Sequence, residues 1–339
     1  MKTFFHRDQS LHEPRTYFSR GAMRAPQELP ARAAALLAAA RGLGFDVVEP
    51  EDRGLAPIAA VHAPDYLAFL RSAHADWIAE SEDWGDEVMS NIFVQTANPV
   101  GILAKAACHI ADGSAPIGAH TYRAAYASAQ CAVAGADAIL GGAREAYALC
   151  RPPGHHARRA AAGGFCFLNN AAVAAERLAG RFARVAILDT DMHHGQGIQE
   201  IFYDRNDVSY VSIHGDPTNF YPVVAGYADE TGRGDGLGFN LNLPMPHGSS
   251  EDVFFAQLDI ARAALDRYAP DVLVLALGFD IYAHDPQAKV AVSAAGFERL
   301  GRAIGAIGLP TLIVQEGGYA IDSLSDLAGR FFSGFAAGR

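Results

Sequence analysis

The chain has 339 residues, half of them hydrophobic, and a formal net charge of −11. This composition can bury a substantial core, which excludes a disordered protein, and the acidic balance argues against a nucleic-acid partner. The opening MKTFFHRDQS lacks the apolar centre of a signal peptide, and no later run is long enough to span a bilayer. We therefore expect a cytoplasmic protein that has neither nucleic acid nor membrane as a partner.

Patterns typical of strands and helices alternate along most of the chain. The helix expected at 30–43, for example, has Pro30 in its first turn and Gly44 just past its end. The alternation predicts an α/β fold: one domain, 1–339, with a mostly parallel sheet covered by helices on both faces. The predicted strands are 2–6, 46–49, 146–150, 186–188, 208–214, 239–243, 271–277 and 311–315, and the predicted helices are 30–43, 64–80, 121–140, 170–178, 250–268, 294–307 and 323–335.

One stretch, residues 81–120, shows no clear periodicity. It carries apolar residues such as Trp84, Ile92 and Phe93 among acids. Long irregular segments inside compact domains usually have a function, so we interpret this one as a loop-rich insertion within the domain.

The segment AILDTDMHHG, residues 186–195, is the most informative part of the sequence. An apolar run ends abruptly in two acids and two histidines, which are costly to bury without partners. Asp191 and His193 offer an oxygen and a nitrogen to one divalent ion, a donor set that suits zinc. A loop with ordinary polar residues is the alternative interpretation.

Three further predicted strands also end in polar clusters. Residues 146–150 lead into RPPGHH, residues 271–277 into Gly-Phe-Asp, and residues 311–315 into Glu-Gly-Gly-Tyr. Ligands of open α/β sheets bind at the carboxyl ends of strands. Asp191, His193 and Asp280 would supply three ligands to one ion and leave a fourth position for water, which is typical of a catalytic zinc site.

The remaining residues of these clusters suit the hydrolysis of an amide. His155 and His156 could take a proton from water and return it to a leaving amine, and Tyr319 could donate its hydroxyl to an oxyanion. Alternation along the strand aims Asp189 away from Asp191, so Asp189 is expected to orient a histidine. A surface histidine pair and an ordinary glycine turn are the alternatives for these motifs.

Taken in order, RPPGHHA, GGFCFLNNAAVAA, AILDTDMHHGQG, LGFDIYAHDP and QEGGY resemble the zinc-dependent histone deacetylase superfamily. The opening third, with HEP and the helix that follows, looks most like the bacterial acetylpolyamine amidohydrolases. The resemblance covers residues 1 to about 335 and implies the arginase/deacetylase fold, with a central parallel sheet of about eight strands.

The resemblance also implies roles for individual residues. It makes Asp191, His193 and Asp280 the zinc ligands, His156 the proton shuttle, Asp189 the partner of His155, and Tyr319 the group that polarises the acetyl carbonyl. For substrate binding it implies Phe165 and Tyr221 as aromatic walls, for which core packing is the alternative, together with Gly164 and the rim carboxylate Asp112. For a structural potassium ion it implies Asp189, Asp191, His193 and Ser212.

The sequence departs from the family pattern in three places, of which the first concerns the base and the other two concern specificity. Gln196 stands where many relatives carry Asp or Asn, so His156 lacks an anionic partner and is more easily neutral. Gln287 stands where a polyamine-selective relative carries an acidic gatekeeper, and residues 99–120 lack a pattern rich in tyrosine and glutamate. Polyamine specificity is therefore less well supported than deacetylation.

We predict a zinc-dependent deacetylase acting on small cationic N-acetylated amines, with acetylpolyamines as the leading substrates. Acetyl-lysine side chains or other short acyl amides are the alternative substrates. An arginase-like ureohydrolase, which would need two manganese ions, and a non-catalytic acyl-binding module are more remote alternatives. By the same resemblance, residues 81–120 are expected to form a homodimer contact that narrows the entrance; a surface loop without a partner is the alternative.

Overall fold

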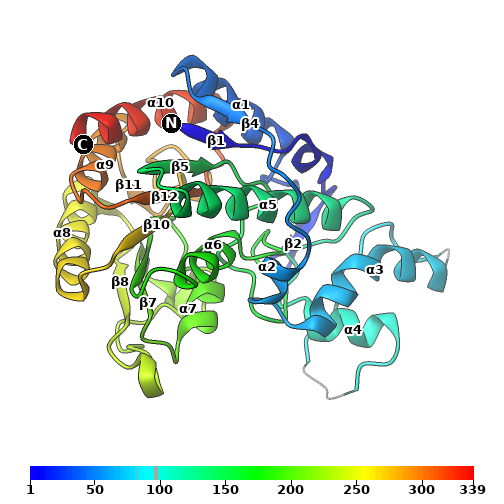
Figure 1. The fold of residues 1–339 in the computed structure, drawn as a ribbon. Coiled ribbons are helices and arrows are strands. Elements are labelled where there is room, and N and C mark those ends of the chain that lie inside the picture. The colour runs from blue at the N-terminus through cyan, green and yellow to red at the C-terminus, as the bar shows by residue number, and fades with distance from the viewer. Residues whose placement is uncertain (82, 95–97) are drawn as a thin grey trace.

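The computed structural model describes residues 1–81, 83–94 and 98–339. Within them, the centre of the molecule is an eight-stranded sheet in which all strands are parallel, in the order β4-β1-β5-β12-β10-β6-β7-β8 (Figure 1). The predicted fold class is confirmed. The strands are β1 (Lys2–Phe4), β4 (Asp46–Val48), β5 (Glu145–Ala148), β6 (Val185–Asp189), β7 (Val208–Gly215), β8 (Asn240–Met245), β10 (Val272–Leu277) and β12 (Thr311–Gln315).

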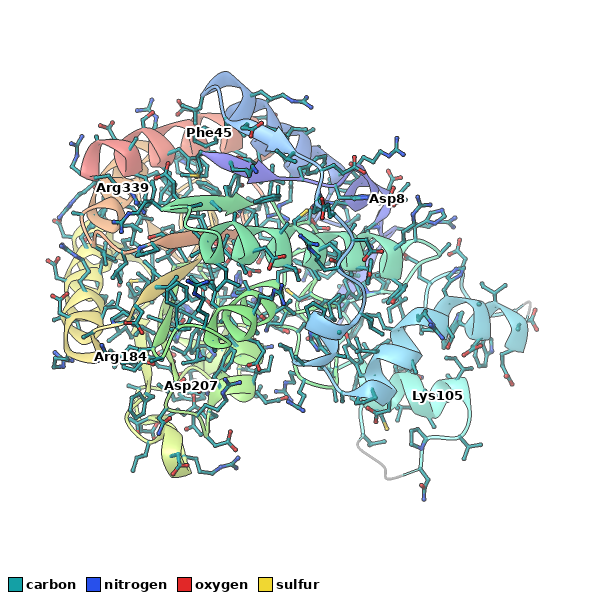
Figure 2. The ribbon with its side chains drawn as sticks, viewed as in Figure 1. Asp8, Phe45, Lys105, Arg184, Asp207 and Arg339 are labelled. Atoms are coloured by element: carbon teal, nitrogen blue, oxygen red, sulfur yellow. The ribbon has the colours of Figure 1, made fainter. Side chains whose placement is uncertain are left out.

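Helices cover both faces of this sheet, and each face has its own hydrophobic core. One core includes residues of α2 (Ala56–Ala59), α3 (Pro64–Glu80), α4 (Ile102–His109), α5 (Thr121–Leu140), α6 (Asn170–Ala179) and α7 (Gln196–Phe202). The other includes residues of α1 (Pro30–Gly42), α8 (Glu251–Tyr268), α9 (Ala294–Gly305) and α10 (Ile321–Gly338). Figure 2 shows how side chains fill the space between the sheet and its helices.

The central strands are apolar throughout because both of their faces are covered. On β10, Val272 and Val274 pack into the core on the α5 and α6 side, whereas Leu273 and Leu275 pack into the core on the α8 to α10 side. All four side chains are fully buried. Burying each one stabilises the fold by about 1.5–3 kcal/mol, which accounts for the continuous apolar runs in the sequence.

Several short elements were not predicted from the sequence. β2 (Tyr17–Ser19) and β3 (Ala22–Arg24) form an antiparallel hairpin, whose two-residue turn has positive φ at Arg20 (51°) and Gly21 (75°). Two consecutive positive φ angles match the twist of a two-residue hairpin turn. β9 (Ser249–Ser250) and β11 (Val290–Ala291) form a second small sheet.

The segment 81–120 contains more regular structure than its sequence indicated. α4 lies within it, packed beside α3, and both helices project from one side of the molecule in Figure 1. Residues 82 and 95–97 of the predicted insertion lie outside the described residues. Among the helices that the structure describes, we find none with the length and apolarity needed to cross a bilayer.

Candidate metal centre and active site

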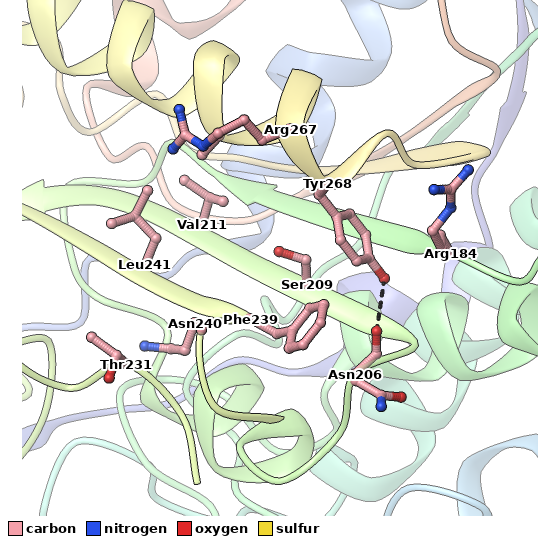
Figure 3. A pocket seen from close by; sticks show the side chains of 12 residues that line it. Arg184, Asn206, Ser209, Val211, Thr231, Phe239, Asn240, Leu241, Arg267 and Tyr268 are labelled. Carbon is pink, nitrogen blue, oxygen red and sulfur yellow. Dashed lines mark hydrogen bonds between the residues drawn. The ribbon is translucent and has the colours of Figure 1, made fainter. Parts of the chain in front are cut away.

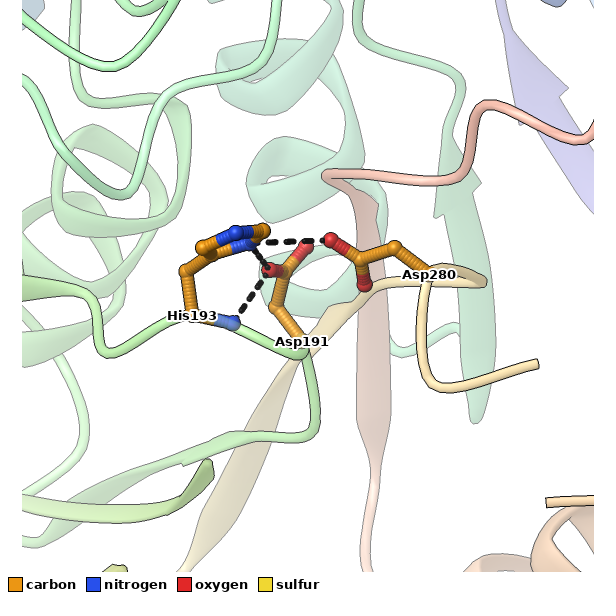
Figure 4. Close-up of side chains that lie close together, drawn as sticks. All are labelled: Asp191, His193 and Asp280. Carbon is orange, nitrogen blue, oxygen red and sulfur yellow. Dashed lines mark hydrogen bonds and ion pairs between the residues drawn. The ribbon is translucent and has the colours of Figure 1, made fainter. Parts of the chain in front are cut away.

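A buried cluster of two carboxylates and one imidazole lies at the carboxyl ends of two neighbouring strands. Asp191 and His193 follow β6, and Asp280 follows β10, which pairs with β6. His193 Nδ1 lies 3.3 Å from Asp191 Oδ1 and 3.1 Å from Asp280 Oδ2 (Figure 4). One potential ligand atom from each residue lies within 4.8 Å of the others, and no second cluster of this kind occurs among the described residues.

The electrostatics of this cluster favour a cation. Burial and the charge of Asp191 raise the pKa of Asp280 to about 7. Burial lowers the pKa of His193, but hydrogen bonds to Asp191 and Asp280 more than offset this and raise it to about 9. Two carboxylates that share a dry space need a positive charge close by, and the raised pKa of His193 shows how strongly they attract one. A divalent ion would supply that charge and leave His193 neutral as a ligand. The oxygen and nitrogen donors are those that zinc takes in open, catalytic sites.

The backbone holds both carboxylates in place. Gly317 N donates to Asp191 Oδ2 at 2.8 Å, and Met192 N donates to Asp280 Oδ1 at 2.9 Å. A Cβ atom at Gly317 would lie 2.5 Å from Asp191 Oδ2, and one at Gly278 would lie 2.3 Å from the same oxygen. The glycines of the two motifs are thus required for the close approach of strand ends to the metal ligands.

The tandem histidines lie beside the metal cluster in different environments. His155 Nδ1 is 3.0 Å from Asp189 Oδ2, and His156 Nδ1 is 2.7 Å from Gln196 Oε1. Burial lowers the pKa of His155, but Asp191 and Asp189 more than offset this and raise it to about 10. For His156, burial and the neighbouring His155 and His193 lower the pKa well below 6.5. At neutral pH, His156 is therefore the neutral histidine of the pair and suits the role of a base.

Tyr319 sits on the turn after β12, which is held by a buried arginine. Arg32 donates from Nε to Gly318 O at 2.5 Å and from Nη2 to Glu316 O at 2.6 Å. Its guanidinium group lies 4.7 Å from the centroid of the Tyr319 ring. Burial raises the pKa of Tyr319 well above 10, so its hydroxyl stays protonated and can donate a hydrogen bond.

The sequence analysis missed the charged cluster behind this turn. Glu28 Oε1 lies 2.8 Å from Arg32 Nη1 and 3.0 Å from Arg151 Nε, and all three side chains are about 1% exposed. Arg32, near the start of the alanine-rich helix α1, was the available signal, because an arginine on an apolar helix needs a buried partner or a solvent-facing position.

A narrow cavity of about 200 Å³ leads to the metal cluster. The Phe165 ring packs edge-on against Tyr319, with centroids 5.9 Å apart, and the Tyr221 ring packs against His156 at 4.7 Å. Gly164 has φ +56°, and a Cβ there would lie 2.4 Å from His156 Cδ2. The lining residues are Tyr17, Ser19, Arg20, Arg24, Gln27, Ser114, His156, Gly164, Phe165, His193, Tyr221, Pro286, Gln287 and Tyr319.

Two predicted site residues, Asp112 and Ser212, and one acid of segment 81–120, Glu87, do not line that cavity. Asp112 lines an adjoining surface groove and accepts a hydrogen bond from Tyr221 at 2.7 Å. Ser212 pairs with Asp189 across β6 and β7, and its Oγ is 2.7 Å from His214 Nδ1. Glu87 accepts hydrogen bonds from the backbone of Arg15 in a separate cavity, so it does not face the active site.

A larger cavity of about 690 Å³ lies at the amino ends of β7 and β8, at the opposite end of the sheet (Figure 3). In this cavity Tyr268 donates its hydroxyl to Asn206 O at 3.3 Å, and Arg184 lies within 4.0 Å of Asp271. These polar groups already have partners, and the metal ligands lie at the other end of the strands.

Comparison with known proteins agrees with this geometry. Residues 26–335 match the model of the histone deacetylase domain. The chain belongs to the histone deacetylase family. Within this family, it is 67% identical over 338 residues to an acetylpolyamine amidohydrolase of Burkholderia pseudomallei, covering 99% of each chain. It is 38% identical over 329 residues to an acetylpolyamine amidohydrolase of Mycoplana ramosa, covering 96% of each chain.

Solved structures show the same fold. A crystal structure of the acetylpolyamine aminohydrolase from Burkholderia pseudomallei matches with a TM-score of 0.99 at 67% identity, covering 100% of this chain and 99% of that one. The HD domain of HDA15 matches with a TM-score of 0.79 at 27% identity, covering 99% of this chain and 89% of that one. The predictions of family and of a metal-binding deacetylase are thereby confirmed, and the arginase-like alternative is not supported.

Proposed function

We propose that this deacetylase uses one zinc ion per subunit to remove acetyl groups from small N-acetylated amines, with acetylpolyamines as the substrate class. The observation that carries the proposal is the buried cluster of Asp191, His193 and Asp280 beside a cavity of only about 200 Å³. A cavity of this size suits a slender aliphatic chain between the Phe165 and Tyr221 rings. The full-length relatives named acetylpolyamine amidohydrolases support the same substrate class.

The residues around the metal cluster have different roles in the proposed reaction. Zinc in such a site supplies Lewis acidity, which polarises a carbonyl group and lowers the pKa of water to about 7. Neutral His156 accepts the proton of the attacking water and returns it to the nitrogen of the leaving amine, so that acetate and the free amine are released. Tyr319 donates its hydroxyl to the oxygen on which negative charge develops. His155 remains paired with Asp189 and keeps its charge beside the metal ligands.

We also propose that a structural potassium ion lies near Asp189 and Ser212, with Asp191 and His193 contributing main-chain oxygens. The pairing of Asp189 with Ser212 on adjacent parallel strands supports this proposal. Oxygen ligands from carboxylates and carbonyls suit such a hard cation. Loss of thermal stability when potassium is replaced by tetramethylammonium, with zinc kept bound, would support it, and an unchanged unfolding temperature would refute it.

For assembly, we propose a homodimer whose contact includes the described part of segment 81–120. Ile92 and Phe93 are 48% and 45% exposed, and Phe93 lines the groove beside the active site together with Phe18. Trp84 is not part of this surface, because it packs on Trp77 with centroids 4.4 Å apart. Light scattering should give a dimer mass that Phe93→Asp reduces to the monomer. A monomeric wild-type chain would refute the proposal.

A substrate panel tests the proposed function. The zinc-loaded protein should release acetate from N-acetylputrescine and N-acetylcadaverine with a higher kcat/KM than from an acetyl-lysine peptide, since a free polyamine has no peptide backbone to accommodate at the mouth of this small cavity. Faster turnover of the peptide would move the proposal to the acetyl-lysine alternative. No turnover of any acetylated amine would refute it.

A further inference from the structure

A continuous chain of side-chain hydrogen bonds links the rim of the active site to the proposed base. Tyr221 OH lies 2.7 Å from Asp112 Oδ2, Gln196 Nε2 lies 3.2 Å from Tyr221 OH, and Gln196 Oε1 lies 2.7 Å from His156 Nδ1. The inner two members, Gln196 and His156, are each 5% exposed. Water therefore has little access to the inner part of this chain.

The chemistry of the four groups allows these bonds to run in only one direction. The carboxylate of Asp112 can only accept a hydrogen bond, so the hydroxyl of Tyr221 must donate its single proton to Asp112. The Tyr221 oxygen is then an acceptor, and Gln196 must present its NH₂ group to it. The amide oxygen of Gln196 consequently faces His156, and His156 must carry its proton on Nδ1.

The reversed arrangement fails at Tyr221. If the Gln196 amide were flipped, its oxygen would face Tyr221, whose one proton would then be required by two acceptors at once. One buried acceptor would lose its hydrogen bond, which is unfavourable. The carboxylate of Asp112 thus determines the orientation of the Gln196 amide, although Tyr221 lies between them.

We infer that Asp112, Tyr221 and Gln196 are positioning residues that keep the ring proton of His156 on Nδ1 and leave Nε2 free to accept a proton. This inference rests on the proposed function, because it assigns the three residues a task in that reaction. It adds a task for the hydroxyl of Tyr221 to the interpretation of its ring as an aromatic wall, and it gives Asp112 a task other than direct contact with the substrate. It also gives a physical reason for Gln196, whose amide can join a tyrosine hydroxyl to an imidazole.

Close packing holds the side chains of this hydrogen-bond network in place. A Cβ at Gly163 would lie 2.7 Å from Asp112 Oδ2 and 3.2 Å from Tyr221 OH. Ser114 N donates to Asp112 Oδ1 at 2.8 Å, so the other carboxylate oxygen is occupied and Oδ2 is left for Tyr221. The rotamer of the carboxylate is therefore set before any substrate binds.

Tyr221→Phe removes the hydroxyl and keeps the ring, so it tests the inference directly in the zinc-loaded enzyme. We expect kcat for N-acetylcadaverine to fall about tenfold, with KM changed less than twofold and zinc content unchanged, because a share of His156 then adopts the wrong tautomer. Tyr227→Phe is the matched control: Tyr227 OH donates to Val223 O away from this chain, and its removal should leave kcat unchanged. A KM effect with intact kcat would make Tyr221 a substrate contact and overturn the inference.

A second substitution separates tautomer control from simple packing. A carboxylate at position 196 can only accept, so Gln196→Glu should fix the Nδ1–H tautomer without help from Tyr221. The double variant Tyr221→Phe/Gln196→Glu should recover kcat to within about threefold of wild type, a strongly non-additive result. If kcat of the double variant stays as low as that of Tyr221→Phe, or falls further, these hydrogen bonds do not set the tautomer and the inference fails.

The tautomer can also be read without any substrate. In ¹⁵N-histidine-labelled, zinc-loaded protein, with His156 assigned by its loss in His156→Ala, Nδ1 should show the shift of a protonated ring nitrogen. Tyr221→Phe should move this signal toward an average of the two tautomers. An Nε2–H tautomer in the wild-type protein would overturn the inference. Absence of turnover with the expected spectrum would refute the proposed function and leave the tautomer assignment standing.

Discussion

The buried group of Glu28, Arg32 and Arg151 makes a sharp prediction about stability. One carboxylate faces two guanidinium groups at 2.8 and 3.0 Å, in a part of the core where all three side chains are about 1% exposed. Glu28→Gln keeps the size of the side chain and removes the only carboxylate that lies within 4.0 Å of either guanidinium group among the residues that the structure describes. Breaking a buried pair by removing one partner costs about 3–5 kcal/mol, because the charge left behind has no compensation.

The assay is equilibrium unfolding in urea, followed by circular dichroism, at pH 7. Glu28→Gln should lower the free energy of unfolding by about 3–5 kcal/mol. The matched control is Glu298→Gln, which breaks an exposed pair with Arg302 at 3.2 Å on α9 and should change the free energy by less than about 0.5 kcal/mol. Equal, small losses in both variants would refute the conclusion that the buried group stabilises the fold.

The contacts of Glu28 with the two arginines also predict how the stability of the fold depends on pH. Burial raises the pKa of Glu28, but Arg151 and Arg32 more than offset this and hold it below its ordinary value of 4.5. A carboxyl group whose folded pKa is depressed stabilises the fold above its unfolded pKa and loses this contribution as the pH falls. The stability difference between wild type and Glu28→Gln should therefore shrink as the pH is lowered through 4.5.

Further predictions concern the active site. Asp191→Ala or Asp280→Ala should lower bound zinc below half an equivalent, measured by elemental analysis, and a variant with full zinc would exclude that residue as a ligand. Tyr319→Phe should lower kcat by on the order of 100-fold with zinc content and KM nearly unchanged, whereas a pure KM effect would contradict its role toward the oxyanion. Arg20 and Arg24 are exposed cations at the cavity, so the double change to Gln should raise kcat/KM for N-acetylcadaverine about fivefold at low ionic strength and much less at high salt. A gain that is independent of salt would show that size, not charge, limits access.

Much of the fold could be predicted because the sheet is covered on both faces. β10 and β12 are short apolar runs bounded by polar residues, and they lie where the sequence indicated. The hairpin of β2 and β3 was missed because strands of three residues give no period, and α4 was missed because it lies within an otherwise irregular segment. The turn of the hairpin requires positive φ angles at Arg20 and Gly21, and of these two residue types only glycine is a sequence signal for such an angle.

The candidate site also contains residues that could be predicted from the sequence and contacts that could not. Asp191, His193 and Asp280 could be named because each follows an apolar strand and parallel strands end at one edge of the sheet. The contact between Tyr221 and Gln196 could not be foreseen, since 25 residues separate them and Tyr221 lies in a loop after β7. Sequence patterns identify which residues carry chemistry, whereas the partners that orient them depend on how loops pack in three dimensions.

A zinc titration of the metal-free protein tests the central claim most directly. Acetate release from N-acetylcadaverine should rise linearly with added zinc and reach its plateau at one equivalent per chain, and Asp280→Ala should neither bind the ion nor respond to it. Full activity in the metal-free protein, or a plateau at two equivalents, would contradict a single zinc site formed by Asp191, His193 and Asp280.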